Sequence, residues 1–123
     1  FRGTESILVL EDDKRILRLT KRILERAGYE VRVVSNGAEA LDQAQRGNPI
    51  ELLLSDVVLG ESNGPEVAKQ LLDKHPTLRV IFMSGYAPDA LQPQHAVGHA
   101  TNVLQKPLTQ VRLLSEIRKA LDE

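Results

Sequence analysis

Residues 52–56 read Leu-Leu-Leu-Ser-Asp, an almost wholly apolar run that ends on a carboxylate. A run without polar–apolar alternation is typical of a strand that is buried on both faces of a parallel sheet. Asp56 would then place an acidic side chain at the edge of the core, where a charge without a partner is costly. The stretch predicts a central parallel strand and marks its carboxyl end as the place where chemistry is expected.

Four further strand-like runs accompany this one along the chain. They cover residues 7–10, 31–34, 80–83 and 102–105. Helical periodicity separates them, over 14–27, from Asn36 to near Gly47, from 63–66 onward and after the capping residue Thr109. The segment 87–100 contains two prolines and a glycine, so any helix there is expected to be short or irregular. The alternation indicates an α/β domain with five strands and five helices.

The order of the strands is predicted from composition and from the handedness of the crossovers. The run 31–34 contains Arg32, which suits a sheet edge, whereas the run 52–55 is apolar enough for the centre. With right-handed crossovers we expect the order 2-1-3-4-5, a flavodoxin-like doubly wound five-stranded parallel sheet with helices on both faces. In such a sheet a ligand crevice opens at the carboxyl ends of strands 1 and 3.

The composition is that of a folded domain. We expect the 123 residues, of which 41% are hydrophobic, to form one domain, with 1–5 as a linker. Because the first residue is Phe1, the chain is expected to be part of a longer protein. No apolar stretch approaches the roughly 20 residues of a membrane span, and the lack of cysteine fits a reducing cytoplasm. The net charge of −1 provides no global field for nucleic acid.

Chemically active side chains follow the strand-like runs at corresponding positions. Glu11-Asp12-Asp13 follows the first run and Asp56 the third, while Ser84 and Lys106 follow the fourth and fifth. Two carboxylates about 4 Å apart repel by roughly 4 kcal/mol at an effective dielectric near 20, and Mg²⁺ would remove that penalty. The set predicts a Mg²⁺-dependent phosphoryl acceptor in which Asp56 attacks while Lys106 and Ser84 contact phosphoryl oxygens.

Each residue also has a plainer interpretation when taken alone. The acidic cluster could cap the helix that follows it, Asp56 could cap a loop, and Lys106 could be solvated. His95 and His99 could share a helix face and hold a metal, although Gly98 lies between them. A nucleotide- or flavin-binding domain is disfavoured because the loop after 7–10 is acidic where a phosphate cradle would be glycine-rich. The shared position of the residues favours the phosphoryl acceptor.

Five stretches of sequence together carry a family resemblance. In chain order they are Ile7-Leu8-Val9-Leu10-Glu11-Asp12-Asp13, Ser55-Asp56-Val57-Val58-Leu59, Gly64, Met83-Ser84-Gly85-Tyr86-Ala87 and Lys106-Pro107. With these the chain resembles the receiver domain of two-component response regulators over essentially its whole length. The resemblance implies that Asp56 is the phosphoacceptor, Ser84 the switch hydroxyl and Lys106 the phosphate-pairing lysine.

The same resemblance implies further properties of the site. Glu11, Asp12, Asp56 and the backbone carbonyl of Val58 would bind Mg²⁺, and the Lys106–Pro107 peptide bond would be cis. The domain would catalyse its own phosphorylation and dephosphorylation. Val58 and Tyr86 would flank the path of attacking water, and since neither orients water as a carboxylate or amide does, we expect slow self-dephosphorylation.

Two departures from the family pattern concern the output of the domain. Leu59-Gly60 stand where the family often has Met-Pro. Val103 stands at the switch position where the family usually has a Tyr or Phe that moves with the switch hydroxyl. A standard aromatic switch is therefore not expected.

The resemblance is strongest to receivers at the C-terminus of hybrid sensor histidine kinases. It implies a histidine kinase or a histidine phosphotransfer domain as partner, with kinase activity in another part of the parent chain. The domain would be cytoplasmic, as the cytoplasmic part of a membrane-bound sensor, and would itself contact neither nucleic acid nor membrane. The alternative is a stand-alone response regulator that acts through protein–protein contacts.

The helix predicted over 14–27 carries a basic face. Its cations are Lys14, Arg15, Arg18, Lys21, Arg22 and Arg26, opposed only by Glu25. This face could be simply solvated, could bind nucleic acid, or could dock a helical histidine-bearing partner. For docking, Leu19 between Arg15 and Arg22 is the expected contact, with Pro107 as a fourth position.

Overall fold

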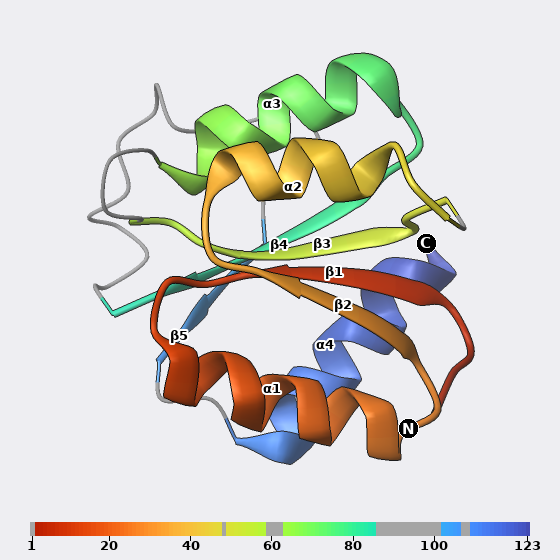
Figure 1. Cartoon of the computed structure of the whole chain (residues 1–123). Coiled ribbons are helices and arrows are strands. Elements are labelled where there is room, and N and C mark those ends of the chain that lie inside the picture. Colours follow the sequence, from red (N-terminus) through yellow and green to blue (C-terminus); the bar gives the residue numbers. More distant parts are fainter. Residues whose placement is uncertain (1, 48, 59–62, 86–101, 107–108) are drawn as a thin grey trace.

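The computed structural model describes residues 2–47, 49–58, 63–85, 102–106 and 109–123 (Figure 1). Strands and helices alternate along the chain. In order they are β1 (Ser6–Leu10), α1 (Lys14–Arg26), β2 (Glu30–Val34), α2 (Gly37–Ala44), β3 (Leu52–Asp56), α3 (Gly64–Lys74), β4 (Arg79–Ser84), β5 (Asn102–Gln105) and α4 (Gln110–Asp122). Among these helices none is long and apolar enough to cross a membrane.

The five strands form one sheet, and every pairing in it is parallel. The strand order is β2-β1-β3-β4-β5, which confirms the predicted flavodoxin-like topology. Helices α2 and α3 cover one face of the sheet, and α1 and α4 cover the other (Figure 1). The described residues contain four helices; the segment 87–100, where a fifth was expected, lies outside them.

Side chains of the central strands alternate between two apolar cores. Ile7 and Leu54 belong to the core under α1 and α4, whereas Leu8 and Leu53 belong to the core under α2 and α3. All five residues of β1 and of β3 are buried, as expected for strands with helices on both sides. The edge strand β2 is more exposed, and its Arg32 donates to backbone carbonyls at the end of α2.

Local sequence determines where the helices begin. The carboxylate of Asp13 accepts hydrogen bonds from the N–H groups of Arg15 and Ile16 and so caps α1. Asn36 caps α2 in the same way, and Asn63 caps α3, in which Pro65 occupies the first turn. Gly28 follows α1 with a φ of 103°, the left-handed conformation that glycine adopts without strain.

The element boundaries differ from prediction at functionally relevant ends. Strands β3 and β4 include Asp56 and Ser84, because Asp56 pairs with Met83 and Ser84 with Gln105. The two polar residues are therefore held by the sheet and do not lie in the loops that follow. Helix α2 ends at Ala44, before the predicted Gly47, because a tighter turn joins the N–H of Gln45 to the carbonyl of Asp42.

Candidate functional site

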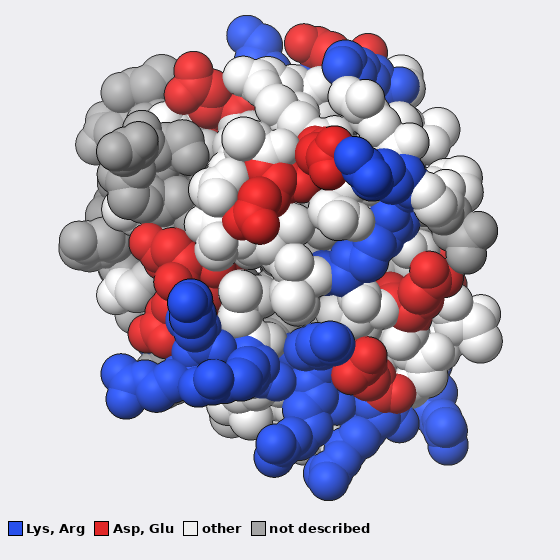
Figure 2. Space-filling model, viewed as in Figure 1, with Lys and Arg blue, Asp and Glu red and all other residues white. Residues whose placement is uncertain are grey.

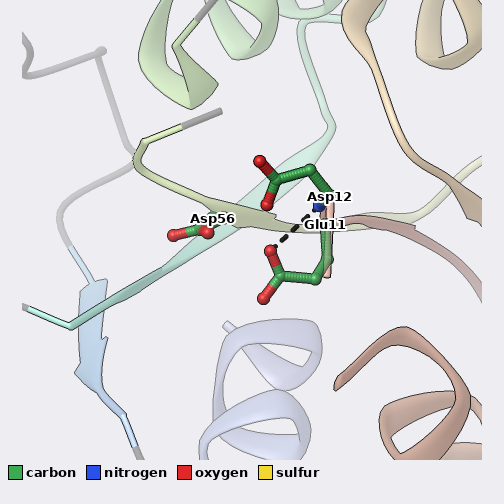
Figure 3. A group of neighbouring side chains, drawn as sticks. All are labelled: Glu11, Asp12 and Asp56. Atoms are coloured by element: carbon green, nitrogen blue, oxygen red, sulfur yellow. Dashed lines mark hydrogen bonds between the residues drawn. The ribbon is translucent and has the colours of Figure 1, made fainter. Parts of the chain in front are cut away.

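Three acidic side chains meet at the carboxyl edge of the sheet, where β1 and β3 end. Glu11 and Asp12 directly follow β1, and Asp56 is the last residue of β3. Figure 3 shows the carboxylates of Glu11 and Asp12 extending from the end of β1 toward that of Asp56. One carboxylate oxygen from each of the three residues lies within 4.8 Å of the others. The structure thus brings together residues that are 45 positions apart in sequence.

The three carboxylates differ in their surroundings. Glu11 is fully buried, Asp56 is 8% exposed and Asp12 is open to solvent. The N–H of Asp12 donates to Glu11 Oε2 over 3.0 Å, which fixes the Glu11 carboxylate beside its neighbour. Burial raises the pKa of Glu11 to about 7, with Asp56 adding to the effect and Lys106 opposing it. Negative charge at this position is therefore costly.

Lys106 provides a positive charge within this acidic group. Its Nζ lies 2.6 Å from Glu11 Oε1 and 3.1 Å from Asp56 Oδ2, so one ammonium bridges two carboxylates. The lysine is positioned because its N–H donates to the carbonyl of Ser84, which continues the pairing of β5 with β4. Burial lowers the pKa of Lys106, but hydrogen bonds to Glu11 and Asp56 outweigh this and the net pKa is raised. The lysine therefore remains an ammonium.

The donor set fits a hard divalent cation. All three groups offer carboxylate oxygens, two from the buried floor and one from the solvent side, which is the pattern that Mg²⁺ accepts together with several waters. Burial is the main reason that the Glu11 carboxylate is costly to ionise and its pKa is raised, and a bound cation would offset that cost. Glu11, Asp12 and Asp56 are thus the residues that would hold such an ion.

Asp13 has a different role from its two acidic neighbours. It caps α1 and is not among the residues that meet at the sheet edge. The capping interpretation of the acidic cluster holds for this residue, and the site interpretation fits Glu11 and Asp12. Both patterns are present because strand end and helix start follow one another directly.

The remaining predicted site residues lie around this group. Ser84 ends β4 and is 5% exposed. Val58 pairs with Asn63 in an isolated antiparallel bridge, and its side chain is exposed. Val103 in β5 is half-buried against the core under α2 and α3. Pro107 and Tyr86 lie outside the described residues, as do Leu59-Gly60, His95 and His99.

Two residues behind the site, Ser55 and Gly64, were placed on their elements by the sequence but were given no role in the site. Ser55 Oγ donates to the carbonyl of Asp56, and the first residue of α3, Gly64, lies against both. A Cβ added to Gly64 would meet the carbonyl oxygen of Asp56 at 2.0 Å. The only signal for Ser55 in the sequence is a hydroxyl inside an otherwise apolar run.

A groove adjoins the site on the side of α1 and α4. Its volume is about 300 Å³, and its lining consists of Ile16, Leu19, Thr20, Ile23, Met83, Lys106 and Leu113. Of the predicted docking residues, Arg15, Leu19 and Arg22 are all exposed on α1. Lysine and arginine side chains gather over the lower part of the molecule, where α1 lies (Figures 1 and 2).

Known proteins share this sequence pattern. The family model of the response regulator receiver domain matches residues 7–118. The response regulator receiver protein CpdR of Brucella abortus is 38% identical over 115 residues, which cover 94% of this chain and 95% of that protein. The sensor kinase CckA of the same organism is 30% identical over 98% of this chain, which spans only 13% of that kinase.

Solved structures agree with these relatives. A CheY-like receiver domain protein from Methanospirillum hungatei superposes with a TM-score of 0.85 at 30% identity, covering 98% of this chain and 95% of that one. The response regulator protein TrrA from Thermotoga maritima, solved in complex with Mg²⁺ and BeF, superposes with a TM-score of 0.83 at 26% identity. That similarity covers 95% of this chain and 99% of TrrA.

Proposed function

Because the chain belongs to the response regulator receiver domain family, we propose that Asp56 accepts a phosphoryl group from a partner's phosphohistidine in a Mg²⁺-dependent reaction. The observation that carries this proposal is the meeting of three carboxylates within 4.8 Å, with Lys106 bridging two of them. The TrrA complex with Mg²⁺ and BeF supports the choice of ion. The domain would thereby catalyse its own phosphorylation and act in two-component or phosphorelay signalling.

The proposed transfer is an in-line displacement at phosphorus. A bond forms between an Asp56 carboxylate oxygen and phosphorus while the P–N bond to the partner's histidine breaks. The electron pair of that bond stays on the imidazole, which takes a proton from solvent. Mg²⁺ would be held by Glu11, Asp12, Asp56 and the backbone carbonyl of Val58. It would neutralise negative charge on the phosphoryl group.

Two further side chains would act on the phosphoryl group itself. Lys106 Nζ already lies 3.1 Å from Asp56 Oδ2, so a phosphoryl group on Asp56 would enter the reach of the ammonium. Ser84 lies at the end of the neighbouring strand β4, from which its hydroxyl would donate to a phosphoryl oxygen. Because the switch position is Val103, any movement of Ser84 toward the phosphoryl group would not be accompanied by the movement of an aromatic ring.

Replacement of Asp56 tests the acceptor. We expect wild-type protein incubated with acetyl phosphate and Mg²⁺ to gain the mass of one phosphoryl group, and Asp56→Asn to gain none. Asp73→Asn, which removes an exposed carboxylate from α3, is the matched control and should be labelled like wild type. Labelling of Asp56→Asn at the wild-type rate would show that the acceptor is another residue.

We propose a histidine kinase or histidine phosphotransfer domain as the donor, docked on α1 and the adjoining groove. Lys106, which contacts Asp56, is one of the lining residues of the groove, so a partner helix lying there would bring its histidine close to Asp56. Leu19, 58% exposed, offers apolar contact, and Arg15 and Arg22 flank it with positive charge. Pro107, the fourth predicted docking residue, follows Lys106 in sequence and lies outside the described residues. The charge pattern favours a partner helix with acidic side chains.

Charge reversal on α1 separates docking from chemistry. Arg15→Glu and Arg22→Glu should slow phosphoryl transfer from a kinase and leave labelling by acetyl phosphate unchanged. Lys69→Glu, an equal change of charge on α3 across the sheet, should leave both rates unchanged. Equal slowing by Lys69→Glu would mean that net charge, and not this surface, governs the encounter.

Two settings for the domain are supported by different relatives. We propose that it is the cytoplasmic receiver of a hybrid sensor kinase, which the similarity to CckA supports. A stand-alone regulator is the second candidate, and the greater identity to CpdR over nearly that protein's full length favours it. The reading frame of the parent gene decides between them, because only the first setting requires a kinase core in the same frame.

The phosphorylated form is proposed to be long-lived. Val58 offers an exposed apolar side chain where a carboxylate or amide would orient water for attack. Val58→Asn should shorten the lifetime several-fold, measured as the decay of phosphoprotein after removal of acetyl phosphate. Val111→Asn, at a valine on α4 that is also largely exposed, should not change it. Rapid decay of the wild-type phosphoprotein, unaltered by Val58→Asn, would contradict this proposal.

A further inference from the structure

Ser55 is a buried hydroxyl directly before the proposed acceptor. It is the one polar residue within the apolar part of β3, and it is fully inaccessible to solvent. Its Oγ donates a hydrogen bond of 2.9 Å to the backbone carbonyl of Asp56. A buried hydroxyl in such a place costs free energy unless it is bonded, so this contact is part of the structure of the strand end.

Ser55 lies on the opposite side of the sheet to the carboxylate of Asp56. Along β3, Leu53 and Val57 belong to the core under α2 and α3, whereas Leu52 and Leu54 belong to the core under α1 and α4. By this alternation Ser55 faces α2 and α3, and Asp56 faces the side on which Lys106 meets it. Ser55 therefore supports the acceptor from behind and lies apart from the reacting oxygens.

The start of α3 closes around the same carbonyl. A Cβ on Gly64 would lie 2.0 Å from the Asp56 carbonyl oxygen and 2.7 Å from Ser55 Oγ, so the glycine packs directly on both. The N–H of Gly64 also donates to the carbonyl of Val57 over 2.9 Å. The carbonyl of Asp56 is thus contacted by a hydroxyl and by the first residue of a helix, and the Val57 N–H of the same peptide donates to the carbonyl of Met83 over 2.9 Å.

We infer that Ser55 is a positioning residue for phosphoryl transfer: its hydroxyl fixes the backbone of Asp56, and with it the direction of the attacking carboxylate. The inference rests on the proposed function of Asp56. The same peptide leads into Val57 and Val58, so its orientation also sets the path of the segment proposed to supply a carbonyl to Mg²⁺. Without the hydroxyl, the Asp56 carbonyl loses this hydrogen bond and its orientation is less restrained, whereas the pairing of Asp56 with Met83 and the fold persist.

Three variants test this role with acetyl phosphate at saturating Mg²⁺. Ser55→Ala should lower the maximal rate of labelling at Asp56 about tenfold, since a displacement of about 1 Å can cost up to about 100-fold. Ser55→Thr retains the hydroxyl and should stay within about twofold of wild type. Ser6→Ala removes another buried hydroxyl, at the start of β1, and is the matched control that should label normally.

Thermal unfolding of each variant separates positioning from stability. Ser55→Ala and Ser6→Ala should both be folded at the assay temperature, and only Ser55→Ala should be labelled slowly at Asp56. If Ser55→Thr does not fold, Ser55→Cys replaces it, and its weak thiol donor should give a rate between wild type and alanine. A folded Ser55→Ala that labels as fast as wild type overturns the inference, as does a folded Ser55→Thr that is as slow as alanine.

The outcome also distinguishes this inference from the proposed function. Wild-type protein that is never labelled at Asp56 overturns both. Wild-type protein labelled at Asp56, with Ser55→Ala equally fast, overturns only the role of Ser55.

Discussion

Lys106 illustrates how a single residue makes the acidic group tolerable. Its ammonium contacts the fully buried Glu11 and also Asp56, so two of the three clustered carboxylates share one countercharge. Asp12 stays exposed to water. The remaining excess of negative charge is what a divalent cation would neutralise, which is the electrostatic reason to expect Mg²⁺ to bind at this edge.

Gly64 gives a residue-scale prediction that depends on close approach. Gly64→Ala places a methyl group 2.0 Å from the Asp56 carbonyl oxygen, so backbone must move. We expect a loss of about 1–3 kcal/mol in the free energy of unfolding, measured by urea denaturation, together with slower labelling of Asp56. Gly85→Ala is the control, because a Cβ there meets nothing within 4 Å. Equal stability of the two variants would contradict the close contact.

Residues of the site were predictable to different degrees. Glu11, Asp12, Asp56 and Lys106 could be grouped from sequence because each follows a strand-like run, and parallel strands bring such ends together. The contact of Ser55 with Gly64 could not, because it depends on how closely α3 approaches β3. The pairing of Lys106 with Glu11 likewise depends on side-chain geometry across two strands.

At the scale of elements, α4 is tied to the start of the chain through Arg118. Its guanidinium donates to both carboxylate oxygens of Glu5, to the backbone carbonyl of Arg2 and to Asp122. The hydrogen bond from Arg118 lowers the pKa of Glu5 to about 2. The segment before β1 is thereby fastened to the last helix.

This tie predicts a pH dependence of stability. Because the pKa of Glu5 is lower in the folded state, ionised Glu5 stabilises the fold above pH 4.5, and this contribution is lost as pH falls from about 4.5 to 2. Glu5→Gln should lower the free energy of unfolding by about 1 kcal/mol near neutral pH, where partial exposure limits the gain. The difference from wild type should shrink below pH 4.5, followed by urea denaturation across the pH range.

A matched variant controls for this effect. Glu25→Gln removes an exposed carboxylate from α1 and should change stability little at any pH. If Glu5→Gln and wild type differ equally at neutral and acidic pH, the ion pair is not the cause.

Element boundaries were predicted where capping residues mark them. Asn36, Asn63 and Thr109 each accept a hydrogen bond at the start of the predicted helix. The end of α2 was predicted too late, near Gly47, because a glycine is a common signal for the end of a helix. In the structure the helix ends at Ala44, where a tight turn forms and Arg32 donates to the carbonyl of Gln43. Local sequence does not reveal contacts with side chains of a distant strand such as β2.

For the molecule as a whole, binding of an ion should increase the stability of the folded state. A ligand that binds only the folded state at about 100 times its dissociation constant adds about 2.7 kcal/mol. We therefore expect Mg²⁺ to raise the midpoint of thermal unfolding by several degrees, with NaCl of equal ionic strength as the control. Asp12→Asn should reduce this rise, whereas Asp73→Asn should not. A rise that survives Asp12→Asn unchanged would place the ion elsewhere.

The overall topology was predictable because hydrophobic patterning and crossover handedness leave few arrangements. The apolar run Leu52–Ser55 required burial on both faces, and Arg32 in the run 31–34 marked an edge; the sheet order has both features. The grouping of positive charge over α1 was also visible in sequence. The partner that binds this surface could not be predicted, because it depends on a second molecule.

The alternation of side chains across β3 has a consequence for substitutions. Exposed positions of α1 and support positions such as Ser55 lie in different layers of the molecule, with the sheet between them. Substitutions at exposed positions of α1 would therefore alter the choice of the proposed partner without reaching the support behind Asp56, and substitutions behind Asp56 would alter the rate of transfer without reaching α1.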